Sequence, residues 1–130
     1  MTDTSGPSAV ATAIDHVQVA IPAGGEDAAR AFYGNLLGLR EIDKPANLLG
    51  GGGVWLQTGS LQIHLGTDAK FTPATKAHVA FRVADVDAVR ARLAAAGHPI
   101  REDEPLPGYR RFYTEDPFGN RVEVLTPGGE

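Results

Sequence analysis

The residues best suited to chemistry in this 130-residue chain are His16, His64, His78 and Glu123. Each lies where apolar and polar residues alternate, on the polar side of the alternation. His16 precedes His78 by 62 positions, and His64 precedes Glu123 by 59 positions. Imidazole and carboxylate groups bind divalent ions such as Zn, Ni, Co, Mn or Fe(II). Taken singly, these residues also fit ordinary solvated positions on a sheet, so the prediction of one shared metal site depends on their joint spacing.

Elements that could position these residues recur in one order along the chain. Period-two alternation predicts strands, and an apolar stagger of three to four residues predicts helices. Asp85 is expected to cap the second helix, and Gly38 and Gly97 to end the two helices. In order, we expect a strand over 14–21, a helix over 26–37, strands over 39–43, 54–58 and 61–65, a strand over 76–83, a helix over 86–96, and strands over 99–102, 110–115 and 121–125.

This order predicts an α+β protein of two βαβββ modules, about 13–66 and about 76–127. Each module is too small to close its own core, so the two must pair with each other or with copies in a second chain. Residues 1–12 are rich in Thr, Ser, Gly and Ala and are expected to form a flexible tail.

Composition excludes several classes of function. The chain has 16 acidic and 12 basic residues, and this balance argues against nucleic acid as a partner. It contains no cysteine, so disulfides, thiolate metal sites and cysteine nucleophiles are excluded. No apolar run approaches the roughly 20 residues of a membrane span. We therefore expect a cytoplasmic protein whose partner is a small-molecule substrate.

Four segments of the chain carry a family-like pattern: IDHVQVAIP, AFYGNLLGLRE, KAHVAFRV and FYTEDPFGNRVEVLTP. They resemble the vicinal oxygen chelate superfamily, which includes glyoxalase I, bleomycin-resistance proteins and extradiol dioxygenases. The resemblance covers about residues 13–127 and implies one domain, in which paired βαβββ modules form a cup-shaped mixed β-sheet with helices packed outside. It also implies that His16, His64, His78 and Glu123 are the ligands of one divalent metal ion. Glyoxalase I usually has a carboxylate where this chain has His64.

The resemblance implies two alternative enzymatic functions. In a glyoxalase-like lyase or isomerase, the metal would bind vicinal substrate oxygens and stabilise an enediolate, while Glu123 moves a proton between adjacent carbons. In an extradiol dioxygenase, His16, His78 and Glu123 would form a two-histidine, one-carboxylate triad. His64 would then be an acid–base residue, and Tyr113 could bind a substrate oxygen.

A third alternative is a drug-binding protein without enzymatic activity, similar to the bleomycin-resistance proteins. Aromatic side chains could line its pocket, namely Trp55, Phe71, Phe112 and Phe118. Histidines at ligand positions argue against this alternative, since a binding protein without metal has no need of them. Fold resemblance alone does not decide among the three functions.

The open sheet edges of two small modules predict a homodimer, as the family resemblance also implies. Light scattering should therefore give a mass about twice the 13.7 kDa of one chain. A monomer at micromolar concentration would contradict this prediction.

Overall fold

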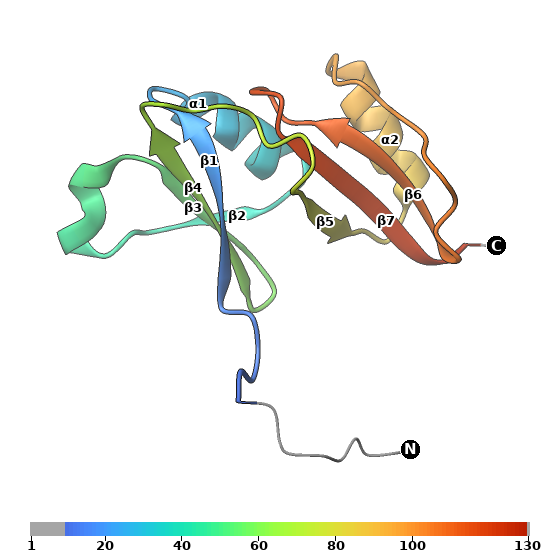
Figure 1. Cartoon of the computed structure of the whole chain (residues 1–130), viewed down its shortest axis with the longest axis horizontal. Coiled ribbons are helices and arrows are strands. Elements are labelled where there is room, and N and C mark those ends of the chain that lie inside the picture. The colour runs from blue at the N-terminus through green and yellow to red at the C-terminus, as the bar shows by residue number, and fades with distance from the viewer. Residues whose placement is uncertain (1–9, 130) are drawn as a thin grey trace.

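The computed structural model describes residues 10–129, which form two modules lying side by side, each with a sheet and a helical segment (Figure 1). Of the expected tail, residues 1–9 lie outside the described residues, whereas residues 10–12 are exposed and form no helix or strand. Within the described part, no helix is long and apolar enough to cross a membrane. The order of elements confirms the predicted α+β class.

Module one contains a four-stranded sheet in the order β1-β4-β3-β2, with β1 and β4 parallel and the other neighbours antiparallel. The turn at Gly59 and Ser60 joins β3 to β4, and Thr58 pairs with Leu61. The segment before β3 includes a short 3-10 helix, η2. The elements are β1 His16–Pro22, α1 Glu26–Ala29, η1 Arg30–Leu36, β2 Arg40–Ile42, η2 Ala46–Gly51, β3 Val54–Thr58 and β4 Leu61–Asp68.

Module two repeats this plan with one strand fewer. Its sheet has the order β5-β7-β6, with β5 and β7 parallel, and its helix α2 begins at the predicted cap, where the Asp85 side chain accepts from Ala88 N at 3.1 Å. The strand expected over 99–102 was wrong: only Arg101 pairs, with Tyr113. Pro99 has no N–H to extend this pairing. The elements are β5 Val79–Arg82, α2 Val86–Ala95, β6 Gly108–Glu115 and β7 Arg121–Gly129.

The first helix begins at Glu26 as predicted but changes character after Ala29. From Arg30 it continues as a π-helix, η1, and Leu37 N donates to Phe32 O at 3.0 Å. Phe32 and the next residue, Tyr33, are both buried, at 0% and 1% exposure. The α-helical stagger predicted Phe32 as a core residue but not Tyr33. The wider π turn is the local difference that accompanies burial of both aromatic rings.

A buried carboxylate joins the two modules. Asp116, at 3% exposure in the turn between β6 and β7, accepts from the Tyr33 hydroxyl of η1 at 2.7 Å. It also accepts from Phe118 N, Asn120 N and the Asn120 amide, each at 2.9 Å. The same amide donates to the Ala20 carbonyl oxygen of β1 at 2.9 Å. The turn between β6 and β7 is therefore the main polar contact between the modules.

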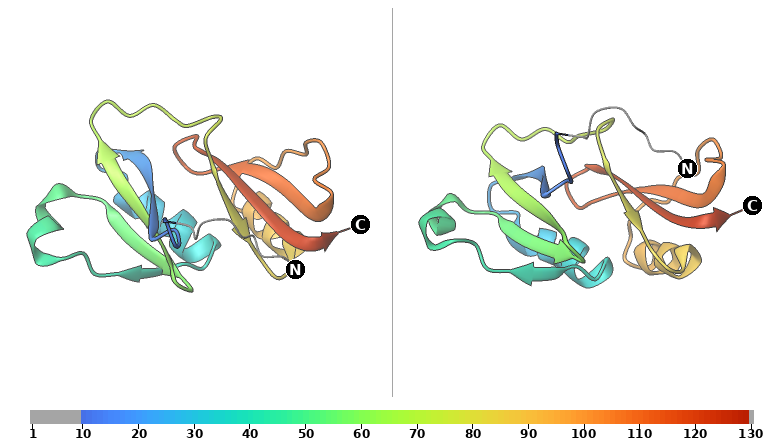
Figure 2. Two further views of the ribbon diagram at one scale, coloured as in Figure 1. Left: turned by 60° about the horizontal axis from the view of Figure 1, so that its bottom comes forward. Right: turned by 90° about the horizontal axis from the view of Figure 1, so that it is seen from below.

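Two further contacts reinforce this junction on the helical side, where both views of Figure 2 place η1 beside α2. Arg92 of α2 donates to the carbonyl oxygens of Asn35 at 2.9 Å and Leu36 at 3.2 Å, at the end of η1. At the other end of the helical segment, a Cβ on Gly25 would lie 2.9 Å from the Phe118 ring. Glycine at this position therefore permits the close approach of module two.

We expect Asp116→Ala to lower the free energy of unfolding by about 3 kcal/mol or more, because several buried donors lose their acceptor. Burial and the Asp116 charge raise the pKa of Tyr33 well above its usual value, so its hydroxyl remains a donor. Tyr33→Phe removes one of these donors and should lower stability by about 1–2 kcal/mol.

Urea unfolding followed by circular dichroism measures both effects. The matched control is Asp43→Ala, at an exposed aspartate, which should change the free energy by less than about 0.5 kcal/mol. Equal effects at Asp43 and Asp116 would contradict a structural role for the buried carboxylate.

Candidate metal centre

The open face of the module-one sheet carries a three-ring stack centred on His64. Strand register places His64 between Gln18 of β1 and Trp55 of β3. Its ring lies 3.7 Å from the Trp55 ring with 1° between the planes, and 4.1 Å from the His16 ring with 17° between the planes. Strand alternation alone predicted that His16 and His64 share this face, and the stack shows that they are in contact.

The stack sets the charge and orientation of His64. Its side chain is buried, at 5% exposure, and Nε2 lies 2.9 Å from the Gln62 amide oxygen. Desolvation, together with the positive potential of His16, lowers the pKa of His64 below its usual value, although Asp15 opposes the shift. The ring is therefore neutral at pH 7. Because Nε2 donates to Gln62, Nδ1 carries the lone pair that could bind a metal.

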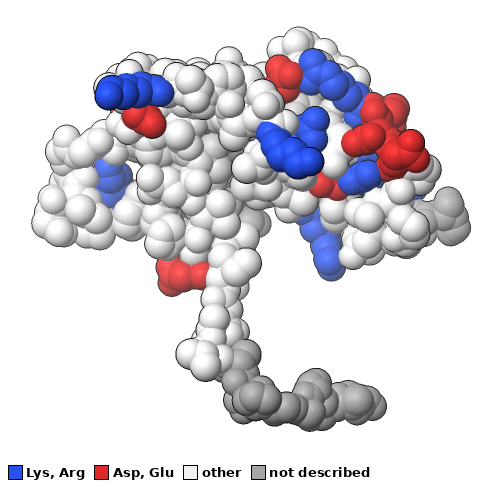
Figure 3. Space-filling view, in the orientation of Figure 1, with Lys and Arg blue, Asp and Glu red and all other residues white. Residues whose placement is uncertain are grey.

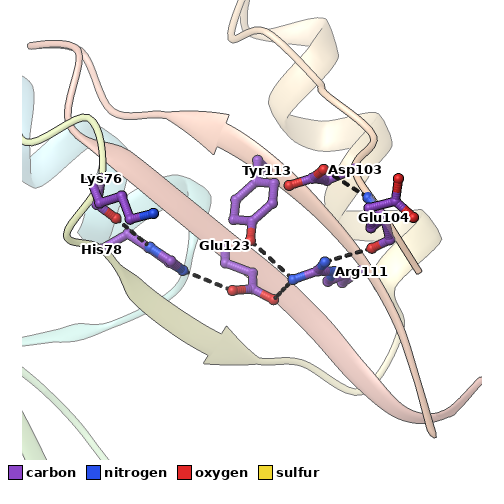
Figure 4. A network of polar contacts seen from close by, with 7 residues as sticks. All are labelled: Lys76, His78, Asp103, Glu104, Arg111, Tyr113 and Glu123. Atoms are coloured by element: carbon purple, nitrogen blue, oxygen red, sulfur yellow. Dashed lines mark hydrogen bonds and ion pairs between the residues drawn. The ribbon is translucent and has the colours of Figure 1, made fainter. Parts of the chain in front are cut away.

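The open face of the module-two sheet brings together His78, which directly precedes β5, and Glu123 of β7 (Figure 4). Nδ1 of His78 lies 2.9 Å from the Lys76 carbonyl oxygen, which can only accept, so this nitrogen carries a hydrogen. Nε2 lies 2.9 Å from Glu123 Oε1. The strand expected over 76–83 is shorter than predicted: residues 75–77 form a bend, and the chain pairs with β7 only from Val79 to Arg82.

Arg111 and Tyr113 of β6 surround the second oxygen of Glu123. Arg111 Nη1 lies 3.2 Å from Glu123 Oε2 and donates to the Tyr113 hydroxyl at 3.0 Å, while Nη2 donates to the Glu104 carbonyl oxygen at 2.5 Å. Tyr113 is itself buried, at 8% exposure, and stands opposite Glu123 in the register of β6 and β7. Sequence reasoning placed Tyr113 at the site but gave Arg111 no role there. Its position on the same side of β6 as Tyr113 was the available signal.

The four predicted ligands therefore occur as two pairs, one in each module. His16 contacts His64, and His78 contacts Glu123. Among residues 10–129, no group of three or more histidine, aspartate or glutamate side chains is arranged to hold a metal ion within one chain. Each pair does have the donor chemistry of a divalent-metal site.

Two cavities have residues of module two in their walls, and one of them reaches His78. The larger, about 360 Å³, is lined by Tyr113 and Arg121 among others, and the smaller, about 230 Å³, lies between the modules and includes His78, Gln18 and Arg121. The smaller cavity is otherwise mainly apolar, with Val17, Val19, Val79 and Val122 in its walls. A small molecule could thus reach His78 from an apolar recess.

The aromatic residues predicted for a drug pocket separate in the structure. Phe112 is fully buried in the core, and Phe71 packs edge-on against the half-buried Phe118. Only Trp55 belongs to the open face. His98, the histidine outside both pairs, is half-buried: its ring packs against Phe32, and Nδ1 lies 3.0 Å from the Glu115 carbonyl oxygen.

The family comparison agrees with the fold. Residues 13–124 match the Glyoxalase/Bleomycin resistance protein/Dioxygenase superfamily. The chain therefore belongs to this superfamily. No curated protein matches it at a significant level.

Solved structures show the same architecture. A protein from Bacillus anthracis described as a glyoxalase family member is 43% identical, with a TM-score of 0.87 over 93% of this chain and 99% of that one. FosX, a fosfomycin resistance protein from Listeria monocytogenes crystallised with Mn(II) and sulfate, is 18% identical, with a TM-score of 0.74 over 91% and 92% of the two chains. TnmS3, an antibiotic binding protein from a Streptomyces species, is 21% identical, with a TM-score of 0.70 over 92% and 99%.

We expect the His64 imidazole to titrate below pH 6.5, the usual value, in an NMR titration. The pKa of His64 is lower in the folded chain than in the unfolded chain, so the unfolded chain takes up the proton first as the pH falls. The stability that neutral His64 contributes is thus present above about pH 6.5 and is lost as the pH falls through its folded pKa.

Two variants test the cause of the shift. His16→Ala should raise the pKa of His64, because it removes a like charge and exposes the ring, whereas Asp15→Asn should lower it further. A His64 ring that titrates at or above 6.5 in the unmodified protein would refute the assignment.

Proposed function

We propose that this protein is a divalent-metal-dependent, glyoxalase-like enzyme, a lyase or isomerase acting on a small substrate with vicinal oxygens. The observation that carries the proposal is the contact between His78 Nε2 and Glu123 Oε1 at 2.9 Å. With Nδ1 hydrogen-bonded to Lys76, a neutral His78 has its Nε2 lone pair facing a carboxylate oxygen. Because both atoms are acceptors, they can lie this close together only with a cation between them, either a proton or a metal ion.

The second contact of each ligand supports metal binding. Metal-bound histidines commonly donate their other ring nitrogen to a backbone carbonyl, as His78 does to Lys76. Ligands about 2.1 Å from one ion and at a right angle to each other are about 3 Å apart, close to the observed separation. The solved FosX structure with Mn(II) shows that this fold accommodates a divalent ion.

We infer that a second copy of the chain completes the site. A catalytic metal needs about three protein ligands, and each module offers two. The His16–His64 pair lies on an open sheet face bordered by β1, the edge strand of its sheet, and the His78–Glu123 pair lies next to β5, the edge strand of the other. In a two-fold dimer, module one of one protomer can face module two of its partner at each of two equivalent sites.

In this site the chain's own residues would bind the substrate and move a proton. Glu123 is the group that transfers a proton between adjacent carbons, and Arg111 holds its second oxygen in place. Because Arg111 donates to the Tyr113 oxygen, the phenolic hydrogen is directed away from Arg111 and is available to a substrate oxygen. A bound divalent ion would supply the Lewis-acid stabilisation of enediolate charge.

An extradiol dioxygenase is the second enzymatic candidate, and the position of Tyr113 directly opposite Glu123 favours it. His16, His78 and Glu123 would then be the ligands of Fe(II), with His64 as the acid–base residue. A drug-binding protein is favoured by a different observation: His64 is already packed between two rings, as in an aromatic platform. TnmS3, which has this fold, binds an antibiotic.

Elemental analysis of protein purified without added metal separates these functions. We expect about one divalent ion per chain, lost in His16→Ala, His78→Ala and Glu123→Ala. His98→Gln, at a histidine outside both pairs, is the matched control and should retain the metal. Zn, Ni or Co with turnover of an α-keto hemithioacetal supports the lyase, and Fe(II) with oxygen uptake on catechols supports the dioxygenase. Absence of metal from the unmodified protein after reconstitution would refute both enzymatic functions.

Complementation between variants tests the shared site. His16→Ala and Glu123→Ala proteins should each bind no metal, but subunit exchange between them restores one intact site in each mixed dimer. A one-to-one mixture should therefore recover about a quarter of the normal metal content. Quenching of Trp55, the only tryptophan of the chain, by Ni(II) gives an independent readout, because its ring stacks on His64. No recovery on mixing would contradict a site shared between two chains.

A further inference from the structure

Arg121, the first residue of β7, is a charged side chain that neither the fold nor the proposed proton transfer uses. It is half-buried, and its guanidinium carbon lies 4.7 Å from the centre of the Tyr113 ring. It lines both of the cavities described above, the one with Tyr113 in its wall and the one with His78. Its backbone N donates to Ala74 O at 2.8 Å, so the segment between the modules holds the start of the strand in place.

The acidic side chains near Arg121 contact other groups, so none of them forms an ion pair with it. Arg111 is paired with Glu123 at 3.2 Å, and Arg101 is paired with Glu115 at 2.6 Å. Glu102 and Asp103 line the larger cavity with Arg121, but Glu102 pairs with Arg90 and Asp103 accepts from the backbone N of Glu104. Within residues 10–129, Arg121 has no acidic partner within 4.0 Å. Figure 3 shows acidic and basic side chains gathered over module two. Among the half-buried arginines of this module, Arg90 and Arg111 are paired with carboxylates, whereas Arg121 is not.

A half-buried guanidinium has lost part of its hydration, and no ion pair offsets this loss of solvation free energy for Arg121. Stacking on Tyr113 covers the flat face of the guanidinium but leaves the N–H groups at its edge available for hydrogen bonds. That edge binds a planar or tetrahedral oxyanion through two parallel hydrogen bonds. The Thr75 hydroxyl lines the same cavity and could donate a third hydrogen bond.

We propose that Arg121 forms an oxyanion subsite, with a carboxylate, phosphonate or phosphate group as its ligand. The subsite lies beside Tyr113 and His78, so an anionic group on Arg121 would place the adjoining oxygens of the same molecule toward the module-two pair. The substrate class is therefore a small oxyacid with oxygens next to its charged group. This assignment of substrate rests on the proposed function, whereas anion binding by Arg121 does not.

The test uses the metal-free protein and two probes, methylphosphonate and acetate. Arginine side-chain N–H signals are followed by NMR as each probe is added, and the Arg121 signal is assigned by its absence in Arg121→Lys. We expect saturable shifts of the Arg121 signal in the unmodified protein. Binding to every variant is followed by the backbone amide signal of Gly119, which lines the same cavity, and should be at least tenfold weaker in Arg121→Gln because charge-assisted hydrogen bonds are lost. Preference for methylphosphonate over acetate would indicate a phosphonate or phosphate substrate, and the reverse preference would indicate a carboxylate.

The matched control is Arg82→Gln, which removes the same charge from an exposed arginine on β5 of the same sheet. It should leave the affinity for both probes unchanged. Equal weakening by the two glutamine variants, or shifts that do not saturate, would overturn the subsite, because either result indicates general electrostatic attraction. Arg121→Lys keeps the charge and should bind with intermediate affinity, which separates loss of binding from loss of folding. Metal binding is measured separately, so failure of the subsite leaves the metal proposal standing.

Discussion

The structure depends on one buried carboxylate. Asp116 accepts hydrogen bonds from two backbone N–H groups of its own turn, from Asn120 and from Tyr33 of the other module. A buried carboxylate with so many donors is stabilising only when every donor is in place, so turn, η1 and β1 must come together in one arrangement. That arrangement sets the start of β7, and with it the positions of Arg121 and Glu123 relative to module one.

Each module also organises its own pair of candidate ligands. In module one, burial and stacking keep His64 neutral and leave one nitrogen free. In module two, the Lys76 carbonyl oxygen orients His78, and Arg111 orients Glu123. Neither pair requires the other to hold its geometry, since each rests on contacts within its own module. A shared site would then be assembled by association of preformed halves, at little conformational cost.

The comparisons place the chain in a superfamily whose members differ in chemistry while sharing a fold. Glyoxalase-like, fosfomycin resistance and antibiotic-binding proteins all have this architecture. What distinguishes one from another must lie in the side chains on the open sheet faces. In this protein those side chains include arginines beside Glu123 and a histidine packed against tryptophan, and they define the charge and shape that a substrate must match.

Much of the fold and part of the candidate site could be predicted from the sequence by itself, because both follow from local periodicity. Period-two alternation located β3 at its observed bounds and assigned His16 and His64 to one face, and Asp85 was predicted as a helix cap from its type and position. Only the tertiary structure decided that Asp116 joins the modules and that Arg111 holds Glu123. The physical reason is that these contacts depend on strand register and on the packing of distant segments. Alternation predicts the face on which a side chain lies, but the whole fold decides which other side chains it contacts there.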